Sequence, residues 1–212
     1  EDFFIGGIVL LFSRELTIID YGDGKTRTKL HHQMQQSVMI IPAEHANMQS
    51  QWGKIIDSAL NEGLLIVRAK SLLIPSDIAD QVGDILQCHP KTTDIIKSMI
   101  GCLVLCLQGE DGVQKCQKLA ESYDQGNSSN SEVCKLLVAT TGVQATDLKN
   151  LLLEGSRHLS STVTLDNSTC CIIKPHAVKS KLTGLIMDHI IQQSYEISAV
   201  SSLYFDRTAS EE

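Results

Sequence analysis

The chain of 212 residues is long enough for one or two domains, and a hydrophobic fraction of 42% is enough to build a globular core. A net charge of −7 leaves no basic footprint for nucleic acid, and no apolar run approaches the roughly 20 residues of a membrane span. The seven cysteines are odd in number and form no CxxC pair. We therefore expect buried free thiols in a reducing compartment, and neither nucleic acid nor a membrane among the partners.

Two β-type runs, residues 8–12 and 16–19, open the chain, and their three-residue connection predicts a hairpin. A Tyr-Gly-Asp-Gly turn signal closes this piece at residue 24. Two strands alone are marginal in water, so residues 1–24 need partners from their own domain or from elsewhere. Residues 25–36 are polar and are interpreted as a linker. Its adjacent His31 and His32 have no further ligand at a suitable spacing, so no metal site is expected.

Residues 37–158 carry the pattern of one α+β domain, because apolar runs that end at proline or glycine alternate with segments of helical periodicity. Strands are predicted at 38–41, 64–74 and 101–107, and helices at 51–62, 76–88, 91–99, 110–122 and 146–154; residues 132–139 lead into a Thr-Thr-Gly sequence before the last helix. This order is that of the ferredoxin-like βαββαβ fold, for which we expect helices on one face of the sheet.

The sequence Thr-Cys-Cys-Ile-Ile-Lys-Pro-His-Ala-Val, residues 169–178, organises the rest of the chain. Its apolar run predicts a buried strand at 170–174, which Pro175 ends because proline cannot donate to a sheet. Lys174 then occupies the last strand position, where a sheet edge opens and a lysine can meet a phosphate. The alternative is a lysine that simply extends its charge from the strand end into solvent. Residues 159–168 before it are interpreted as a linker.

An internal repeat relates the two halves of the chain. Residues 40–41 match 172–173, 53–56 match 184–187, 64–67 match 195–198 and 71–72 match 202–203, with one residue of loop length between the registers. Such a spacing indicates a duplicated domain and not a solenoid. The second copy, residues 169–212, is predicted to supply a strand at 170–174, a helix at 183–193 and a strand at 196–205. Half a sheet leaves an open edge, so we expect further residues or another chain to complete it.

Two motifs resemble one protein family. TCCIIKPHAV at 169–178 is similar to the first strand of a nucleoside diphosphate kinase domain, above all in the axonemal two-domain homolog 7 family. EDFFIG…FSRELTIIDYGD at 1–23 resembles the end of the β-rich, PH-like axonemal module at the head of that family. The resemblance implies a duplicated nucleoside diphosphate kinase fold, preceded by a short β-rich piece. It covers nearly the whole chain, but it is specific only at the two ends.

Enzymes of this family move a phosphoryl group through a covalent phosphohistidine, while cationic side chains and Mg²⁺ meet its charge. The resemblance places Pro42 at the family lysine and Leu148 at the nucleophile; a shifted register places Leu153 there instead. Lys135 stands for an arginine, which keeps the charge but loses the forked geometry. Residues 89–92 replace the arginine and stacking aromatic of the family with His-Pro-Lys-Thr. We therefore expect no catalytic residue in the first domain, and only a weak nucleotide contact at Lys135.

In the second copy, Lys174 matches the family lysine and would be a partial or vestigial nucleotide contact. His176 stands where the family usually has an aspartate, and it is not the nucleophile. No histidine occurs between His89 and His158, so neither register offers a substitute nucleophile to the first domain.

The resemblance thus implies a catalytically inactive scaffold, a microtubule inner protein of ciliary or flagellar axonemal doublets, in the cytoplasm and cytoskeleton. Its expected partners are tubulin, other axonemal proteins and the γ-tubulin complex. No cofactor is expected in this chain; Mg²⁺ and ATP would bind only if a complete second domain is active. Two alternatives stay open: a nucleoside diphosphate kinase that works through such a second domain, and a nucleotide-sensing pseudoenzyme.

Overall fold

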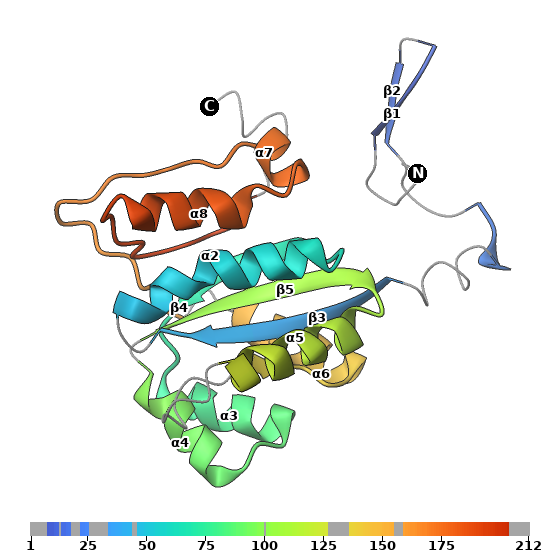
Figure 1. Cartoon of the computed structure of the whole chain (residues 1–212). Coiled ribbons are helices and arrows are strands. Elements are labelled where there is room, and N and C mark those ends of the chain that lie inside the picture. Colours follow the sequence, from blue (N-terminus) through green and yellow to red (C-terminus); the bar gives the residue numbers. More distant parts are fainter. Residues whose placement is uncertain are drawn as a thin grey trace. The chain divides into compact units, whose positions relative to one another are not determined.

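The computed structural model describes residues 8–12, 14–17, 22–25, 34–43, 46–99, 101–126, 136–154 and 159–203. The chain divides into two compact units, residues 1–34 and 35–212, which are described separately (Figure 1). The first unit holds the hairpin of β1 (Ile8–Leu11) and β2 (Arg14–Thr17), which pair antiparallel. The predicted hairpin is confirmed, but Leu11 pairs with Arg14, so its loop has two residues and not three.

The second unit is built on a four-stranded sheet in the order β4-β5-β3-β6. Its strands are β3 (Met34–Pro42), β4 (Leu65–Leu72), β5 (Cys102–Glu110) and β6 (Leu137–Val138). The pairs β4–β5 and β3–β6 are antiparallel. This is the ferredoxin-like fold expected from the sequence. β3 begins at Met34, four residues before the predicted strand and inside the range interpreted as a linker.

The sheet is covered by helices on both faces, so the expected one-faced arrangement is wrong. The helices are α2 (Ala46–Asn61), α3 (Ser76–Leu86), α4 (Pro90–Ser98), α5 (Gly112–Gly126) and α6 (Gly142–Leu148), which the π-helix η1 (Lys149–Glu154) continues. Met39 and Ile41 of β3 pack in one cluster with α2 and α5, whereas Val38 and Ile40 pack in another with α3, α4, α6 and η1. Strand β5 alternates in the same way between the two clusters. Because both central strands are apolar at consecutive positions, each face needs its own cover.

The second copy of the repeat contributes α7 (Pro175–Lys179) and α8 (Thr183–Gln192), and α8 runs beside α2 (Figure 1). The predicted helix at 183–193 is confirmed, whereas α7 was not predicted. The strand predicted at 170–174 is wrong: these residues form no strand, and Ile172 is 78% exposed. A strand exists only through hydrogen bonds to a neighbour, and no strand among the described residues lies beside this segment. Of the strand predicted at 196–205, the described part makes one antiparallel bridge, between Lys70 and Ser201.

Candidate functional site

The end of β3 carries a neutral side chain at the position assigned to the family lysine. Pro42 is buried at the last position of this strand. The next residue, Ala43, donates its N–H to the carbonyl oxygen of Gly101 at 2.8 Å, just before β5 begins. The backbone after Pro42 is therefore fixed against the start of β5, and the position assigned to the lysine offers no cationic group.

Leu148, the residue assigned to the nucleophile, lies at the end of α6 and is fully buried. It belongs to the apolar cluster that also holds Ile40, Val104 and Leu152. Leu153, the alternative in the shifted register, lies in η1 and is 5% exposed in the same cluster. Both side chains thus help to hold α6 and η1 against the sheet.

Lys174 lies exposed at the N-cap of the five-residue helix α7. Its carbonyl oxygen accepts hydrogen bonds from the N–H groups of Ala177 and Val178, at 3.0 and 3.2 Å. The next histidine, His176, is exposed on this helix. Lys135 and the linker pair His31 and His32 lie outside the described residues. The structure therefore places Lys174 at the surface, at the start of α7.

Three cysteines are buried as predicted, in contact with the sheet. Burial raises the pKa of the Cys102 thiol to about 12 and that of Cys116 to about 11, where a hydrogen bond with Ser37 opposes the effect. Burial also raises the pKa of Cys106. These thiols stay protonated near neutral pH and are poor nucleophiles. The prediction of buried thiols is wrong for Cys170 and Cys171, which are exposed because the strand expected to contain them does not form.

Helices α2 and α8 of the second unit pack closely against each other. Gly53 of α2 and Gly184 of α8 lie against each other so closely that neither position admits a side chain. A Cβ atom at Gly184 would lie 2.7 Å from the Asp57 nitrogen and closer still to the Gly53 carbonyl oxygen. A Cβ atom at Gly53 would lie 2.6 Å from the Gly184 carbonyl oxygen and closer still to the Asp188 carboxylate. Two glycines thus let the helix backbones touch.

Next to this contact, the edge of β4 pairs with residues 200–202 through reciprocal hydrogen bonds. Ser71 donates its N–H to the Val200 carbonyl oxygen, and Ser202 donates its N–H to the Ala69 carbonyl oxygen, both at 2.8 Å. The two serine hydroxyls then each accept an N–H: Ser71 Oγ from Val200 and Ser202 Oγ from Ala69, both at 2.9 Å. Each serine therefore makes the same pair of bonds to the opposite segment.

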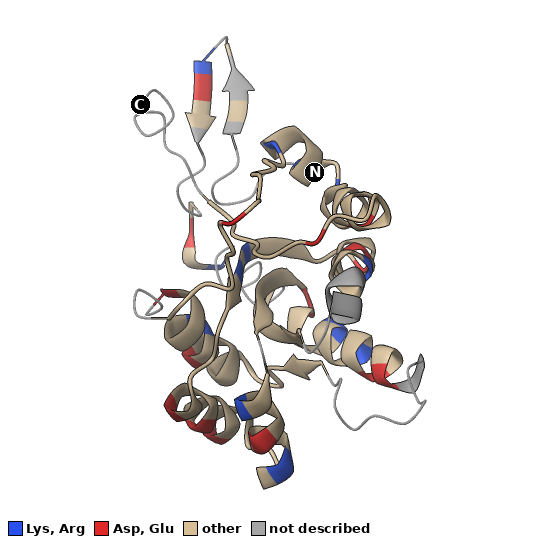
Figure 2. Ribbon diagram, turned by 90° about the vertical axis from the view of Figure 1, so that its left-hand side faces the viewer, with Lys and Arg blue, Asp and Glu red and all other residues tan. Residues whose placement is uncertain are grey.

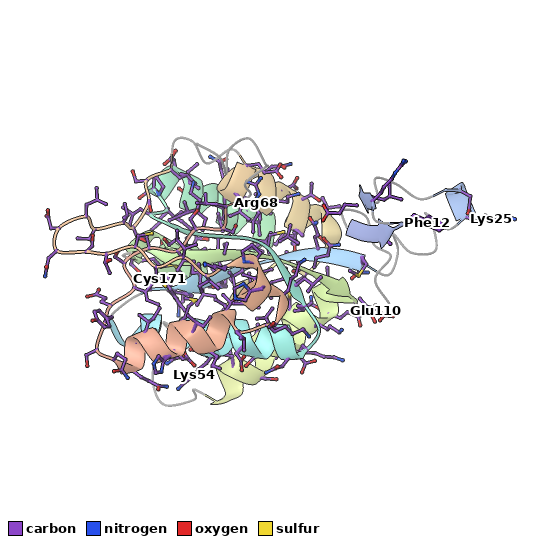
Figure 3. The ribbon with its side chains drawn as sticks, turned by 90° about the horizontal axis from the view of Figure 1, so that it is seen from above. Phe12, Lys25, Lys54, Arg68, Glu110 and Cys171 are labelled. Atoms are coloured by element: carbon purple, nitrogen blue, oxygen red, sulfur yellow. The ribbon has the colours of Figure 1, made fainter. Side chains whose placement is uncertain are left out.

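Charged groups surround the glycine contact. Asp188 Oδ1 is buried and has no hydrogen-bond partner in the part of the chain that the structure describes. Burial raises the pKa of the Asp188 carboxyl; the charge of Lys54 opposes this effect and that of Asp57 adds to it. Figure 3 shows Lys54 on α2 beside α8. At the other end of α2, Lys181 Nζ donates to the Leu60 carbonyl oxygen at 3.0 Å, a favourable place for a cation.

Sequence reasoning found the repeat that contains these residues but not the contact between its copies. Gly53 and Gly184 were aligned with each other, as were Ser71 and Ser202. Small residues aligned on equivalent helices and strands are the signal that could have indicated a close approach.

The rest of the described surface offers few clusters of side chains that could bind a ligand. Acidic and basic residues are interspersed over the helices in Figure 2. Across the described ranges, no group of three or more histidine, cysteine or acidic residues is placed to hold a metal ion. The same residues include no helix long and apolar enough to cross a membrane.

No protein-family model matches the chain. Two curated relatives, both called nucleoside diphosphate kinase homolog 7, come from Rattus norvegicus and Mus musculus. They are 26% and 25% identical to the chain over its whole length, and the chain spans 57% of theirs.

Two solved structures are also similar. One is the nucleoside diphosphate kinase of Aquifex aeolicus, with a TM-score of 0.49 and 14% identity over 57% of this chain and 96% of that one. The other is the nucleoside-diphosphate kinase of Borrelia burgdorferi with bound vanadate and ADP, with a TM-score of 0.44 and 12% identity over 69% of this chain and 96% of that one. The match to these relatives covers the whole of this chain, and the sheet has the ferredoxin-like strand order, so the chain is similar to the nucleoside diphosphate kinase homolog 7 proteins from its first residue to its last.

Proposed function

We propose that the chain is a catalytically inactive, nucleoside diphosphate kinase-like structural component of axonemal doublet microtubules. The proposed lack of catalytic activity is supported above all by the burial of Leu148, the residue assigned to the nucleophile, inside an apolar cluster. A charged phosphoryl group cannot be solvated at such a place. The neutral, buried Pro42 at the lysine position supports the same conclusion.

The structural role rests on a fold that is kept while residues suited to phosphoryl transfer are replaced. The axonemal part of the proposal rests on the two end motifs, residues 1–23 and 169–178, which resemble the axonemal two-domain family. Tubulin, other axonemal proteins and the γ-tubulin complex are the proposed partners, in the cytoskeleton of cilia or flagella.

Incubation of the purified chain with radiolabelled ATP and Mg²⁺ tests the proposed absence of phosphoryl transfer. We expect no acid-labile phosphate on the protein and no exchange of terminal phosphates between nucleotides. The variant Leu148→His supplies an imidazole at the assigned position as a control. It is expected to remain unlabelled and to unfold more easily, because the ring would be buried without a hydrogen-bond partner. Acid-labile labelling of the unmodified chain would contradict the proposal.

Fractionation of ciliated cells that express the tagged chain tests the location. The proposal expects the chain to remain with the axoneme after detergent extraction and to leave it only when the doublets are dissolved. A chain that is released completely by detergent contradicts the axonemal role.

The second candidate is a nucleoside diphosphate kinase active through a complete second domain. Lys174, exposed at the position that the resemblance assigns to the family lysine, favours it. Exchange activity in a longer form that is lost on Lys174→Ala would support this candidate, while the 212-residue chain would stay inactive.

A further inference from the structure

The two copies of the repeat contact each other through equivalent positions. Each residue of the first copy in this contact has its counterpart 131 positions later, so that Gly53 corresponds to Gly184 and Ser71 to Ser202. The contacts are exchanged in the same way. The Ser71 N–H reaches Val200, the counterpart of Ala69, and the Ser202 N–H reaches Ala69 itself. The copies are therefore related locally by a two-fold axis.

This axis passes between Lys70 and Ser201, which are opposite each other in the antiparallel bridge and correspond in the repeat. A surface that meets its own equivalent across a two-fold axis is self-complementary. The surface formed by α2 and the edge of β4 could therefore receive either the second copy in the same chain or the same surface of another chain.

The residues that make the reciprocal contacts do not distinguish these partners, because glycine faces glycine, serine matches serine and Asp57 matches Asp188. The pair of residues on the two-fold axis does distinguish the second copy from another chain. Within one chain, the half-buried Lys70 faces the neutral Ser201. Between two chains, Lys70 would face a second Lys70 at the same close distance, and like charges directly opposite each other in a sheet are destabilising.

We propose that this axis position favours one partner: the surface of α2 and β4 takes the second copy of the repeat in its own chain, and Lys70 weakens its pairing with another chain. Because the second copy has serine at position 201, the repulsion is absent within one chain but present between two chains. The chain is thereby closed on itself, and its β4 edge is unavailable for pairing between molecules.

Two substitutions at the exposed Ser201 test the selection within the chain. Ser201→Lys places a like charge opposite Lys70, whereas Ser201→Glu places an opposite charge on a side chain of similar reach. We expect hydrogen exchange at the Val200 and Ser202 amides to be roughly two- to fivefold faster in the lysine variant than in the glutamate variant. The difference should shrink at high salt. Equal exchange in the two variants would overturn the role of charge at the axis.

Light scattering on size-exclusion fractions tests the exclusion of a second chain. Gly184→Leu displaces the second copy, because its side chain would strike the backbone of α2, but leaves the first copy's surface intact. With Lys70→Ser added, this surface should pair between chains and give a dimer, while Gly184→Leu alone stays monomeric.

The matched control is Gly53→Leu with Lys70→Ser, which damages the first copy's own surface and should stay monomeric. A dimer of this control, equal dimerisation with and without Lys70, or a monomer in the Gly184→Leu/Lys70→Ser double variant would each overturn the proposal.

Discussion

At the scale of single residues, Gly53 of α2 and Gly184 of α8 stabilise the fold, whereas glycine within a helix usually destabilises it. In an exposed helix, replacing glycine by alanine stabilises by about 0.5–1 kcal/mol, because the unfolded chain loses freedom. At Gly53 and Gly184 the added Cβ atom meets the backbone of the other helix. Local helix preference and packing therefore oppose each other here, and packing decides which residue is tolerated.

We accordingly expect Gly53→Ala and Gly184→Ala each to lower the melting temperature and to speed hydrogen exchange at the Ser202 amide. Gly142→Ala is the matched control, because a Cβ atom on this first residue of α6 meets nothing within 4 Å. Its melting temperature should be unchanged or raised. The expectation fails if Gly184→Ala stabilises as much as Gly142→Ala.

Thiol reactivity should separate the cysteines by burial. At pH 8 a thiol reagent is expected to modify the exposed Cys170 and Cys171 in the native protein, and Cys102, Cys106 and Cys116 only after unfolding. The double variant Cys170→Ser/Cys171→Ser should lose two equivalents of fast-reacting thiol. Native modification of Cys102 would show that the strand β5 opens.

At the scale of elements, the sequence predicted the helices well and the strands only where a neighbour exists. The helices 51–62, 76–88 and 91–99 were found within a few residues, because helical periodicity is a local signal. The apolar run 170–174 has the composition of a strand, yet it remains unpaired. Pairing depends on what lies beside a segment, and no local pattern contains that information.

For the candidate site, the identities of the residues could be predicted from the sequence, but their burial and packing could not. The neutral residues Pro42 and Leu148 at catalytic positions were read directly from the resemblance. The burial of Leu148 depends on how α6 packs on the sheet. The contact between Gly53 and Gly184 follows from the arrangement of two repeat copies, which neither copy determines alone.

The end of α3 gives a prediction about local strain. Its C-cap, Gln87, adopts the left-handed conformation at φ 52° while its N–H bonds to Asp84 and the next N–H bonds to Gly83. Left-handed backbone costs an L-residue roughly 1–2 kcal/mol, and glycine avoids this cost. Gln87→Gly should therefore raise the free energy of unfolding in urea by up to about 1 kcal/mol. Gln87→Ala, which keeps the strain, should give no such gain.

At the scale of the whole molecule, the buried thiols predict a loss of stability in alkali. The pKa of Cys102 is about 12 in the folded chain and 9.0 when exposed, so unfolding releases a proton between these pH values. The contribution to stability is complete below pH 9 and is lost as the pH rises toward 12. At pH 10.5 we expect a loss of about 2 kcal/mol from this thiol, measured by urea unfolding against pH 8. Cys102→Ala should reduce the slope, and an unchanged slope would contradict the assignment.

The exchange of hydrogen bonds between Ser71 and Ser202 also has a consequence for the order in which the chain folds. These bonds join residues 129 and 133 positions apart, whereas the β4–β5 pairs span 30 positions, from Leu72 to Cys102, up to 43, from Leu65 to Gln108. Closing so long a loop costs more entropy than forming local contacts, and it is rewarded only when both surfaces already exist. We therefore expect refolding in two kinetic phases, in which the sheet assembles first and its second copy docks last.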